Sequence, residues 1–202
     1  MTAVRHEDLQ KKFRYHHGNL RESLLAAALD ILATQGLEEL SLRKLARVTG
    51  VTQAAPYTYF DSKDDLLAAV AESGFQKLAL QMAEDATGAP NARVRIERLI
   101  GSYIKFAQEN KPLFQIMFGR ELADLKKFPT LAMTAGKSYA LFSAALAKQE
   151  GDARFLTVAS WSLCHGLTTL IVEEKIDIAK FGTTDTAEFV TRVTGLFADQ
   201  IG

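Results

Sequence analysis

The sequence predicts an all-α protein, with a three-helix N-terminal domain over residues 1–62 and a helical C-terminal domain over residues 63–202. Two observations carry this prediction. Apolar residues recur at intervals of three and four along most of the chain, the spacing that places them on one face of a helix. The few prolines, at positions 56, 90, 112 and 129, sit near the expected helix boundaries, and no segment reads convincingly as a strand.

Local signals place the helices of the N-terminal domain. Asn19 with Glu22 three residues later resembles a capping box, so we expect the first helix to open at Asn19 and to end at Gly36 in the left-handed conformation. Ser41 should cap a second helix that runs through Val48. A short third helix is expected from about residue 52 to residue 60.

The rest of the chain is predicted to be helical between short breaks. Asp61 or Ser62 should cap a fourth helix that reaches about Asp85, and the segment ATGAPN at 86–91 reads as a loop. We expect the later helices at about 91–109, 111–118, 128–149, 152–175 and 184–200. Glycine-containing breaks at 151–152 and 182–184 separate the last three.

Composition excludes several classes of protein. The chain has 24 basic and 24 acidic residues, so it has no general charge-driven attraction to nucleic acid, and any such surface must be local. Cys164 is the only cysteine, which rules out an intrachain disulfide. The N-terminus lacks the apolar run of a signal peptide, and no stretch reaches the roughly 18 uninterrupted apolar residues of a membrane span. We therefore expect a cytoplasmic protein without a membrane partner.

The stretch SLRKLARVTGVTQAAPYTYF, residues 41–60, has the pattern of a helix-turn-helix. Leu42, Leu45 and Ala46 face inward, with the small Ala46 at the closest approach of two steeply crossing helices. Gly50 supplies the positive φ of the tight turn. Val51 and Phe60 should anchor the second helix, which leaves its far face free to enter a DNA major groove. A plain helical hairpin would explain Ala46 and Gly50 alone, and the residues that follow favour DNA binding.

Those following residues divide by the DNA atoms that they can reach. Thr52, as the cap of the third helix, would leave Pro56 at the end of its first turn, where the proline costs at most one backbone bond. Gln53 and Thr58 can read base edges, and Ala54 keeps the first turn slim. The predicted phosphate contacts are Thr52, Tyr57, Tyr59 and Lys63, and Ser41 completes the DNA-binding set. For Tyr59, a half-buried ring under the helix is an equal alternative.

The segment from YHHGNLR at 15–21 to Phe75 resembles the N-terminal DNA-binding domain of the tetracycline-repressor-type (TetR/AcrR) transcriptional regulators. The likeness joins the first helix, the helix-turn-helix, the Tyr57-x-x-Phe60 pair and Lys63. It implies an all-helical homodimer that binds a palindromic operator on double-stranded DNA, usually as a repressor. The family commonly has leucine at position 56 and histidine at position 59, whereas this chain has Pro56 and Tyr59. The basic arm at residues 11–14 is a further possible DNA contact.

The C-terminal part carries a second resemblance. WSLCHG at 161–166 is similar to the Trp…His-Gly signature of the WHG-type C-terminal domain. This likeness implies a homodimer through the last two helices and a cavity for a small-molecule effector, apolar or amphipathic, among residues 91–175. A partly buried His165 that orients its neighbours is the preferred interpretation of that residue. The candidate ligand-binding residues are Tyr103, Phe106, Phe114, Met117, Phe118, Tyr139, Trp161 and His165, which as a core would show the same spacing.

Two other classes of function have some support in the sequence. An enzyme would need Cys164 and His165 as nucleophile and base, but adjacent helical residues point about 100° apart and cannot form that pair. No metal-ligand spacing is present, and no cofactor is expected. The remaining alternative is a helical ligand-binding or protein-interaction module that no longer binds DNA.

Overall fold

The structure, a computed structural model, describes residues 19–122, 124–148 and 152–198. The described residues are helical and contain no strand, which confirms the predicted all-α class. The chain divides into two compact units. The first ends at Gly74 and adds Pro112–Ala132, and the second comprises Phe75–Lys111 and the chain from Met133 onward. We describe each unit by itself, and the predicted domain boundary at residues 62–63 stays a prediction.

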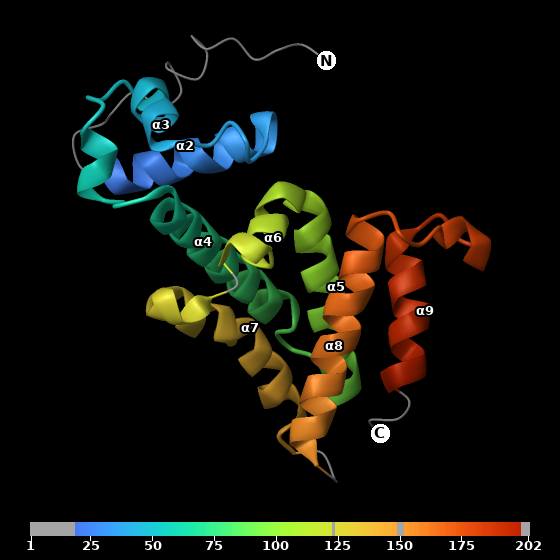
Figure 1. Cartoon of the computed structure of the whole chain (residues 1–202). Helices are drawn as coiled ribbons and strands as arrows, with labels where there is room; N and C mark the ends of the chain where they lie inside the picture. Colours follow the sequence, from blue (N-terminus) through green and yellow to red (C-terminus); the bar gives the residue numbers. More distant parts are fainter. Residues whose placement is uncertain (1–18, 123, 149–151, 199–202) are drawn as a thin grey trace. The chain divides into compact units, whose positions relative to one another are not determined.

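Side-chain caps fix the starts of the helices that open the first unit, and Figure 1 shows the course of these helices. Helix α2 spans Leu20–Gln35, α3 spans Leu42–Thr49, and α4 spans Lys63–Asp85. Asn19 Oδ1 accepts from the Glu22 amide at 3.4 Å, and Ser41 Oγ accepts from the Lys44 amide at 3.2 Å. Ser62 Oγ accepts from the Asp65 amide at 3.1 Å, so Ser62, and not Asp61, caps α4. These starts lie where the sequence predicts them.

Two glycines end the first two helices in different ways. Gly50 has φ 73° and ψ 24°, the left-handed conformation that the turn requires, and its amide bonds to the Ala46 carbonyl. Gly36 also has a positive φ of 86°, but its ψ of 175° lies outside the left-handed helical region. The predicted left-handed cap at Gly36 is therefore wrong in ψ, although the position still favours glycine.

The predicted third helix is a short 3₁₀ turn. Element η1 spans only Ala55–Thr58 and packs against α3, and Thr52 makes no side-chain cap to it. Pro56 accounts for the difference, because it has no amide to donate to residue 52 and its ring crowds the carbonyl four residues earlier. The chain turns instead through bonds from the Ala55 amide to the Thr52 carbonyl and from the Tyr59 amide to the Pro56 carbonyl, 3.0 and 3.1 Å long.

The first unit is completed by α6 (Lys111–Met117) and the turns η2 (Arg120–Leu122) and η3 (Leu125–Lys127). Gly74 of α4 lets α6 come close, because a Cβ on Gly74 would lie 2.6 Å from Met117 Sδ. Met117 is 5% exposed. A larger side chain at position 117, such as tryptophan, would therefore collide with α4 and destabilise the fold.

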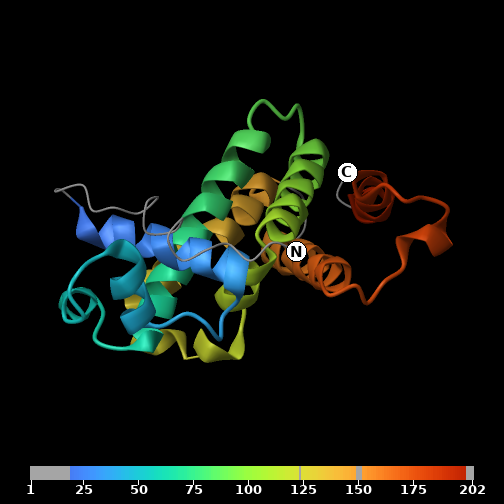
Figure 2. The ribbon, with the colours of Figure 1, turned by 90° about the horizontal axis from the view of Figure 1, so that it is seen from above.

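In the second unit, α5 packs against two other helices. Helix α5 (Ala92–Glu109) contacts both α8 (Ala153–Val172) and α9 (Thr186–Ala198), as Figures 1 and 2 show. Helix α7 (Pro129–Leu146) and the turn η4 (Ile178–Phe181) complete the elements. The predicted helices at 91–109, 111–118 and 128–149 agree with α5, α6 and α7 to within a few residues. Residues 149 and 199–200 of the predicted spans lie outside the described part.

Helix α8 ends three residues earlier than predicted. Glu174 adopts φ 56°, and the Lys175 amide reaches back to the Leu170 carbonyl at 2.8 Å. This is the closing pattern of a Schellman motif with a glutamate at the position that glycine usually takes. Glu174 carries the steric cost of the left-handed conformation, and its exposed ion pair with Lys111 at 3.6 Å offsets little of that cost.

Glu174→Gly should therefore stabilise the protein by about 1 kcal/mol, because glycine adopts positive φ without that cost. Urea unfolding followed by circular dichroism measures the change. Glu174→Ala is the matched control, since it removes the ion pair and keeps the strain, and it should leave stability nearly unchanged. Equal stability of the glycine and alanine variants would show that the backbone at 174 stores no strain.

Candidate nucleic-acid interface and aromatic cluster

The structure places all of the predicted DNA-contact side chains on the surface. Pro56 and Phe60 are buried, and the residues on either side of them turn outward. Tyr57 is 48% exposed and Tyr59 is 44% exposed. The exposed candidates are Ser41, Thr52, Gln53, Ala54, Tyr57, Thr58, Tyr59 and Lys63. We call the exposed segment 52–59 the reading segment. Its contact with DNA stays a prediction.

Two of these side chains also have structural bonds. Thr58 Oγ1 donates to the Ala55 carbonyl at 2.7 Å, so its oxygen lone pairs are what it can offer to a base. Ser41 Oγ accepts the Lys44 amide as the cap of α3. Of the two predicted base readers, Gln53 has more hydrogen-bonding capacity than Thr58, because its side-chain amide both donates and accepts.

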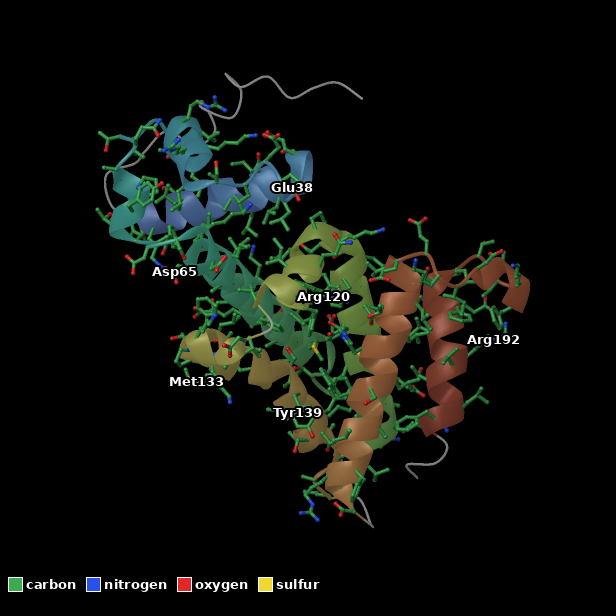
Figure 3. All side chains as sticks on the ribbon, viewed as in Figure 1. Glu38, Asp65, Arg120, Met133, Tyr139 and Arg192 are labelled. Carbon is green, nitrogen blue, oxygen red and sulfur yellow. The ribbon has the colours of Figure 1, made fainter. Side chains whose placement is uncertain are left out.

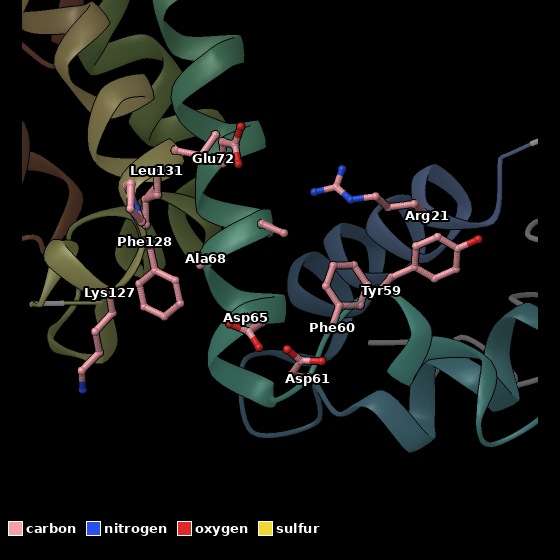
Figure 4. Close-up of a pocket in the computed structure, with 13 residues that line it drawn as sticks. Arg21, Tyr59, Phe60, Asp61, Asp65, Ala68, Glu72, Lys127, Phe128 and Leu131 are labelled. Atoms are coloured by element: carbon pink, nitrogen blue, oxygen red, sulfur yellow. The ribbon is translucent and has the colours of Figure 1, made fainter.

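The position of Tyr59 is compatible with both alternatives that the sequence left open. Its ring is partly exposed, and it also lines a cavity of about 310 Å³ in the first unit, together with Arg21 and Phe60. The Arg21 guanidinium carbon lies 6.0 Å from the centre of the Phe60 ring, and Figure 4 shows both rings beside the Arg21 side chain. A cation over a ring face is favourable, so Arg21 helps to hold Phe60 in place.

The sequence analysis missed a group of basic residues beside Gln53. Gln53 lines a depression of about 340 Å³ with Arg43, Lys44 and Arg47 of α3. Lys44 donates to Glu39 and Gln35, and its ammonium holds the pKa of the Glu39 carboxyl below the ordinary value. Arg43 and Arg47 are exposed. Their spacing of four on a helix whose other face is buried was the signal that could have identified them.

Lys63 is the first residue of α4 and is exposed. Asp64 and Asp65 occupy the first turn of the same helix, where acidic side chains complement the positive end of the helix dipole. These two carboxylates already complement the positive end of the helix dipole. Lys63 is therefore the group at this helix end that suits a phosphate. The basic arm at residues 11–14 lies outside the described part.

The candidate ligand-binding residues fall into two groups in different units. In the second unit, Tyr139, which is labelled in Figure 3, contacts Trp161 edge-on at 6.1 Å. Trp161 stacks on His165 at 5.6 Å with an interplanar angle of 14°. His165 Nδ1 lies 3.0 Å from the Tyr103 hydroxyl. We call Tyr103, Tyr139, Trp161 and His165 the ring chain. Trp161 and His165 share one helix face, as the sequence predicts.

Of the remaining candidates, Phe106, Phe114 and Met117 are core residues and Phe118 is partly buried. Phe106 is buried on α5, and in the first unit Phe114 and Phe118 form a ring pair at 4.8 Å beside buried Met117. The eight residues are therefore not one continuous set within either unit. Within the ring chain, Tyr103 is buried and Trp161 and His165 are partly buried, and all three carry polar atoms, whereas Tyr139 is 37% exposed.

Burial sets the protonation of the ring chain. It lowers the pKa of His165 and raises the pKa of Tyr103 well above the ordinary range, so both groups are neutral near pH 7. Burial also raises the pKa of Cys164, which stays a thiol. His165 bonds to Tyr103, and this geometry gives no nucleophile–base pair with Cys164. Within the described ranges, no group of three or more metal-binding side chains comes together.

Helix α8 is long and apolar enough to cross a membrane when judged by length and composition alone, and 33% of its most apolar window is buried. Several large apolar side chains on α8 and α9 are strongly exposed. Phe155 is 74% exposed and Leu196 is 76% exposed. Large exposed apolar surfaces of this kind are typical of sites that contact another molecule.

Comparison with known families matches both parts of the chain. Residues 24–70 match the bacterial regulatory proteins of the tetR family, and residues 96–196 match the tetracycline repressor-like C-terminal domain. A Rhodococcus sp. RHA1 protein of unknown function is 31% identical over 93% of this chain and 97% of its own, with a TM-score of 0.80. FadR from Bacillus subtilis, solved with stearoyl-CoA, is 17% identical over 89% of this chain and 98% of its own, with a TM-score of 0.67, and shares the fold.

Curated relatives match over shorter stretches. The nucleoid occlusion factor SlmA of Aliivibrio fischeri is 32% identical over 109 residues, which are 52% of this chain and 54% of the relative. The transcriptional regulator BetI of Rhizobium meliloti is 34% identical over 80 residues, which are 40% of this chain and 39% of the relative. The chain thus spans about half or less of the length of these relatives.

Trp161 is the only tryptophan, so its fluorescence reports on the ring chain. A protonated imidazole quenches a stacked indole, and we expect the emission to fall with a midpoint below the ordinary His pKa of 6.5. Because the folded state binds fewer protons than the unfolded state in that window, the free energy of unfolding should also fall as the pH drops below 6.5. His165→Gln should flatten the fluorescence titration. A midpoint above 6.5 would contradict the burial argument.

Proposed function

We propose that this chain, which belongs to the tetR family of bacterial regulatory proteins, is a repressor that binds a palindromic operator as a homodimer and leaves it when a small molecule binds its second unit. The chain is a DNA-binding transcriptional regulator and not an enzyme, as its family and its named relatives indicate. It would act in the cytoplasm, where the operator is. The observation that carries the proposal is the exposed, polar reading segment behind the turn at Gly50.

The surface around the reading segment suits a DNA duplex. Gln53 and Thr58 offer amide and hydroxyl groups to base edges, and Tyr57 adds a hydroxyl with reach to the backbone. Arg43 and Arg47 stand on the Gln53 side and Lys63 follows the segment, so cations flank it. Phosphate contacts of this kind position a protein on DNA, and base contacts then select the sequence. Because the chain as a whole is neutral, this local grouping supports DNA binding better than overall charge does.

The exposed apolar faces of α8 and α9 support a homodimer. Phe155, Val158 and Leu196 are 74%, 49% and 76% exposed. Between α8, η4 and α9 there is also a groove of about 710 Å³ with mainly apolar walls, including Leu167 and Val193. An intramolecular bundle would have buried these side chains, and a second copy packed on the same faces would remove them from water at about 25 cal/mol per Å². The same face explains why α8 is apolar enough to resemble a membrane span.

Release by an effector follows from the course of α4. This helix runs from Lys63 to Asp85 without a break, so its first half belongs to the first unit and its second half to the second. A ligand that prefers one tilt of α4 must lower DNA affinity by the free energy with which DNA disfavours the ligand. A coupling of about 1–3 kcal/mol would weaken operator binding roughly 5- to 150-fold.

The interior of the second unit supports an apolar or amphipathic effector. Its buried polar residues are hydroxyl-bearing residues such as Ser138, Ser160 and Thr168, and Tyr103 and His165 are neutral there. No charged side chain is buried among the described residues. An ionised group on a ligand would therefore lose its hydration there without gaining a partner.

Single substitutions should separate base reading from phosphate binding. Gln53→Ala should cost roughly 1–3 kcal/mol on the best operator and relax preference at one or two base pairs. Lys63→Ala should weaken all sequences alike and lower the salt slope by about 1, because it removes one phosphate contact. Binding to DNA upstream of the chain's own gene, measured by fluorescence anisotropy at several salt concentrations, gives both quantities. Lys137→Ala on α7 is the charge-matched control and should change neither, and an unchanged ranking of operator variants by Gln53→Ala would reject base reading by Gln53.

Charge placed on the exposed face of α9 should break the dimer. Leu196→Glu should halve the mass seen by light scattering and weaken operator binding, since each half-site then binds alone. Leu196 is 76% exposed, so the fold of the single chain should survive the change. Leu80→Glu on α4 is the matched control, because Leu80 is also strongly exposed, at 62%, but lies outside the α8 and α9 faces. A Leu196→Glu variant that keeps the mass of the wild type would place the interface elsewhere.

A further inference from the structure

Another cavity in the C-terminal unit has none of the four ring-chain residues in its wall. It has a volume of about 350 Å³ and is formed where α5 packs against α9. This size falls within the range of small-molecule sites. The residues of its wall that matter here are Gly101, Ser102 and Lys105 of α5 and Val190, Thr191 and Thr194 of α9. Asp85 and Glu97 add two carboxylates to the same wall.

Ser102 lines this cavity with an unsatisfied hydroxyl. The residue is 4% exposed, and within the described part of the chain its Oγ has no hydrogen-bond partner. A buried polar group without a partner costs about 1–3 kcal/mol, and a helical serine normally avoids that cost by bonding to a carbonyl of the preceding turn. Ser102 keeps both its donor and its acceptor capacity for a molecule that enters the cavity.

Gly101 has no structural reason to be glycine. It lies in the middle of α5, where glycine costs about 1 kcal/mol relative to alanine. Its φ is not in the positive range, and a Cβ built there would meet nothing within 4 Å. Neither turn geometry nor close packing demands the missing side chain. Its absence keeps open the space beside Ser102.

The other groups define which ligand fits. Thr191 Oγ1 donates to the Ala187 carbonyl at 2.9 Å and Thr194 Oγ1 donates to the Val190 carbonyl at 2.8 Å, so both offer lone pairs to the cavity. Lys105 offers a donor. Walls of mixed donors and acceptors suit hydroxyl groups, each of which both donates and accepts. Glu97 is held in an ion pair with Arg93 at 3.2 Å, which leaves one carboxylate, Asp85, and one ammonium, Lys105, as the other charged groups of the wall. These charges balance, so a neutral ligand fits better than a charged one.

We propose that the cavity between α5 and α9 binds a small, neutral polyhydroxylated molecule of sugar size. The hydroxyl groups of the ligand bond to Ser102 and to the lone pairs of the two threonines. The Val190 side chain covers the apolar face of the ligand. This site is independent of the DNA-binding proposal and of the ring chain.

Calorimetry on the full chain with a series of sugars that differ in charge tests the proposal. Glucose should bind saturably, and glucosamine and glucuronate should each bind about tenfold more weakly. Gly101→Phe fills the space beside Ser102 and should abolish glucose binding, and Ser102→Ala should weaken it. Gly136→Phe is the matched control and should bind as the wild type does, because Gly136 is also a helical glycine with nothing within 4 Å of a Cβ but lies on α7.

Thermal unfolding of each variant without sugar confirms that it is folded. Tighter binding of glucuronate or of glucosamine than of glucose would overturn the proposed chemistry. Absence of saturable binding of glucose up to about 10 mM would overturn the site itself. Unchanged sugar binding by a folded Gly101→Phe variant would show that the sugars bind somewhere else on the chain.

Discussion

Pro56, buried together with Phe60, is the constraint on which the DNA-facing surface depends. Proline cannot donate the amide bond that would continue an α-helix from residue 52, so the chain turns tightly at this point. The Pro56 carbonyl accepts both the Tyr59 amide at 3.1 Å and the Phe60 amide at 3.0 Å, which closes the turn. With both anchors fixed in the core, the residues between and before them face outward. The exposure of the reading segment follows from these two side chains and does not require a full recognition helix.

Features that depend on contacts within three or four residues were predictable from the sequence. The caps at Asn19 and Ser41 and the left-handed turn at Gly50 are of this kind, because side chain and backbone partner lie in the same short stretch. The end of α8 was not predictable, since the left-handed residue is Glu174 and no glycine marks it. At residues 55–58 the sequence predicts a helix because Pro56 removes at most one backbone bond. These residues form a 3₁₀ turn instead, because the proline ring also crowds the carbonyl four residues earlier.

The candidate sites divide in the same way. The exposure of Gln53, Tyr57 and Lys63 followed from which neighbours are apolar, a pattern that the sequence displays directly. The position of Arg43 and Arg47 beside Gln53 was not predicted, because it depends on how α3 packs against the turn that follows it. The separation of the Phe114–Phe118 pair from the ring chain depends on tertiary structure. Helical spacing in the sequence does not show whether apolar residues belong to one core or to two. The same limit concealed the cavity between α5 and α9.

Selection of bound DNA from a random pool, followed by hydroxyl-radical footprinting of the best sequence on wild-type protein, tests the central claim most directly. The account predicts an enriched inverted repeat, protected in two equal patches whose centres lie about 34 Å apart or somewhat farther. That result would place one reading segment of each copy in successive major grooves. A failure to enrich any sequence, or an enriched site without two-fold symmetry, would contradict the account.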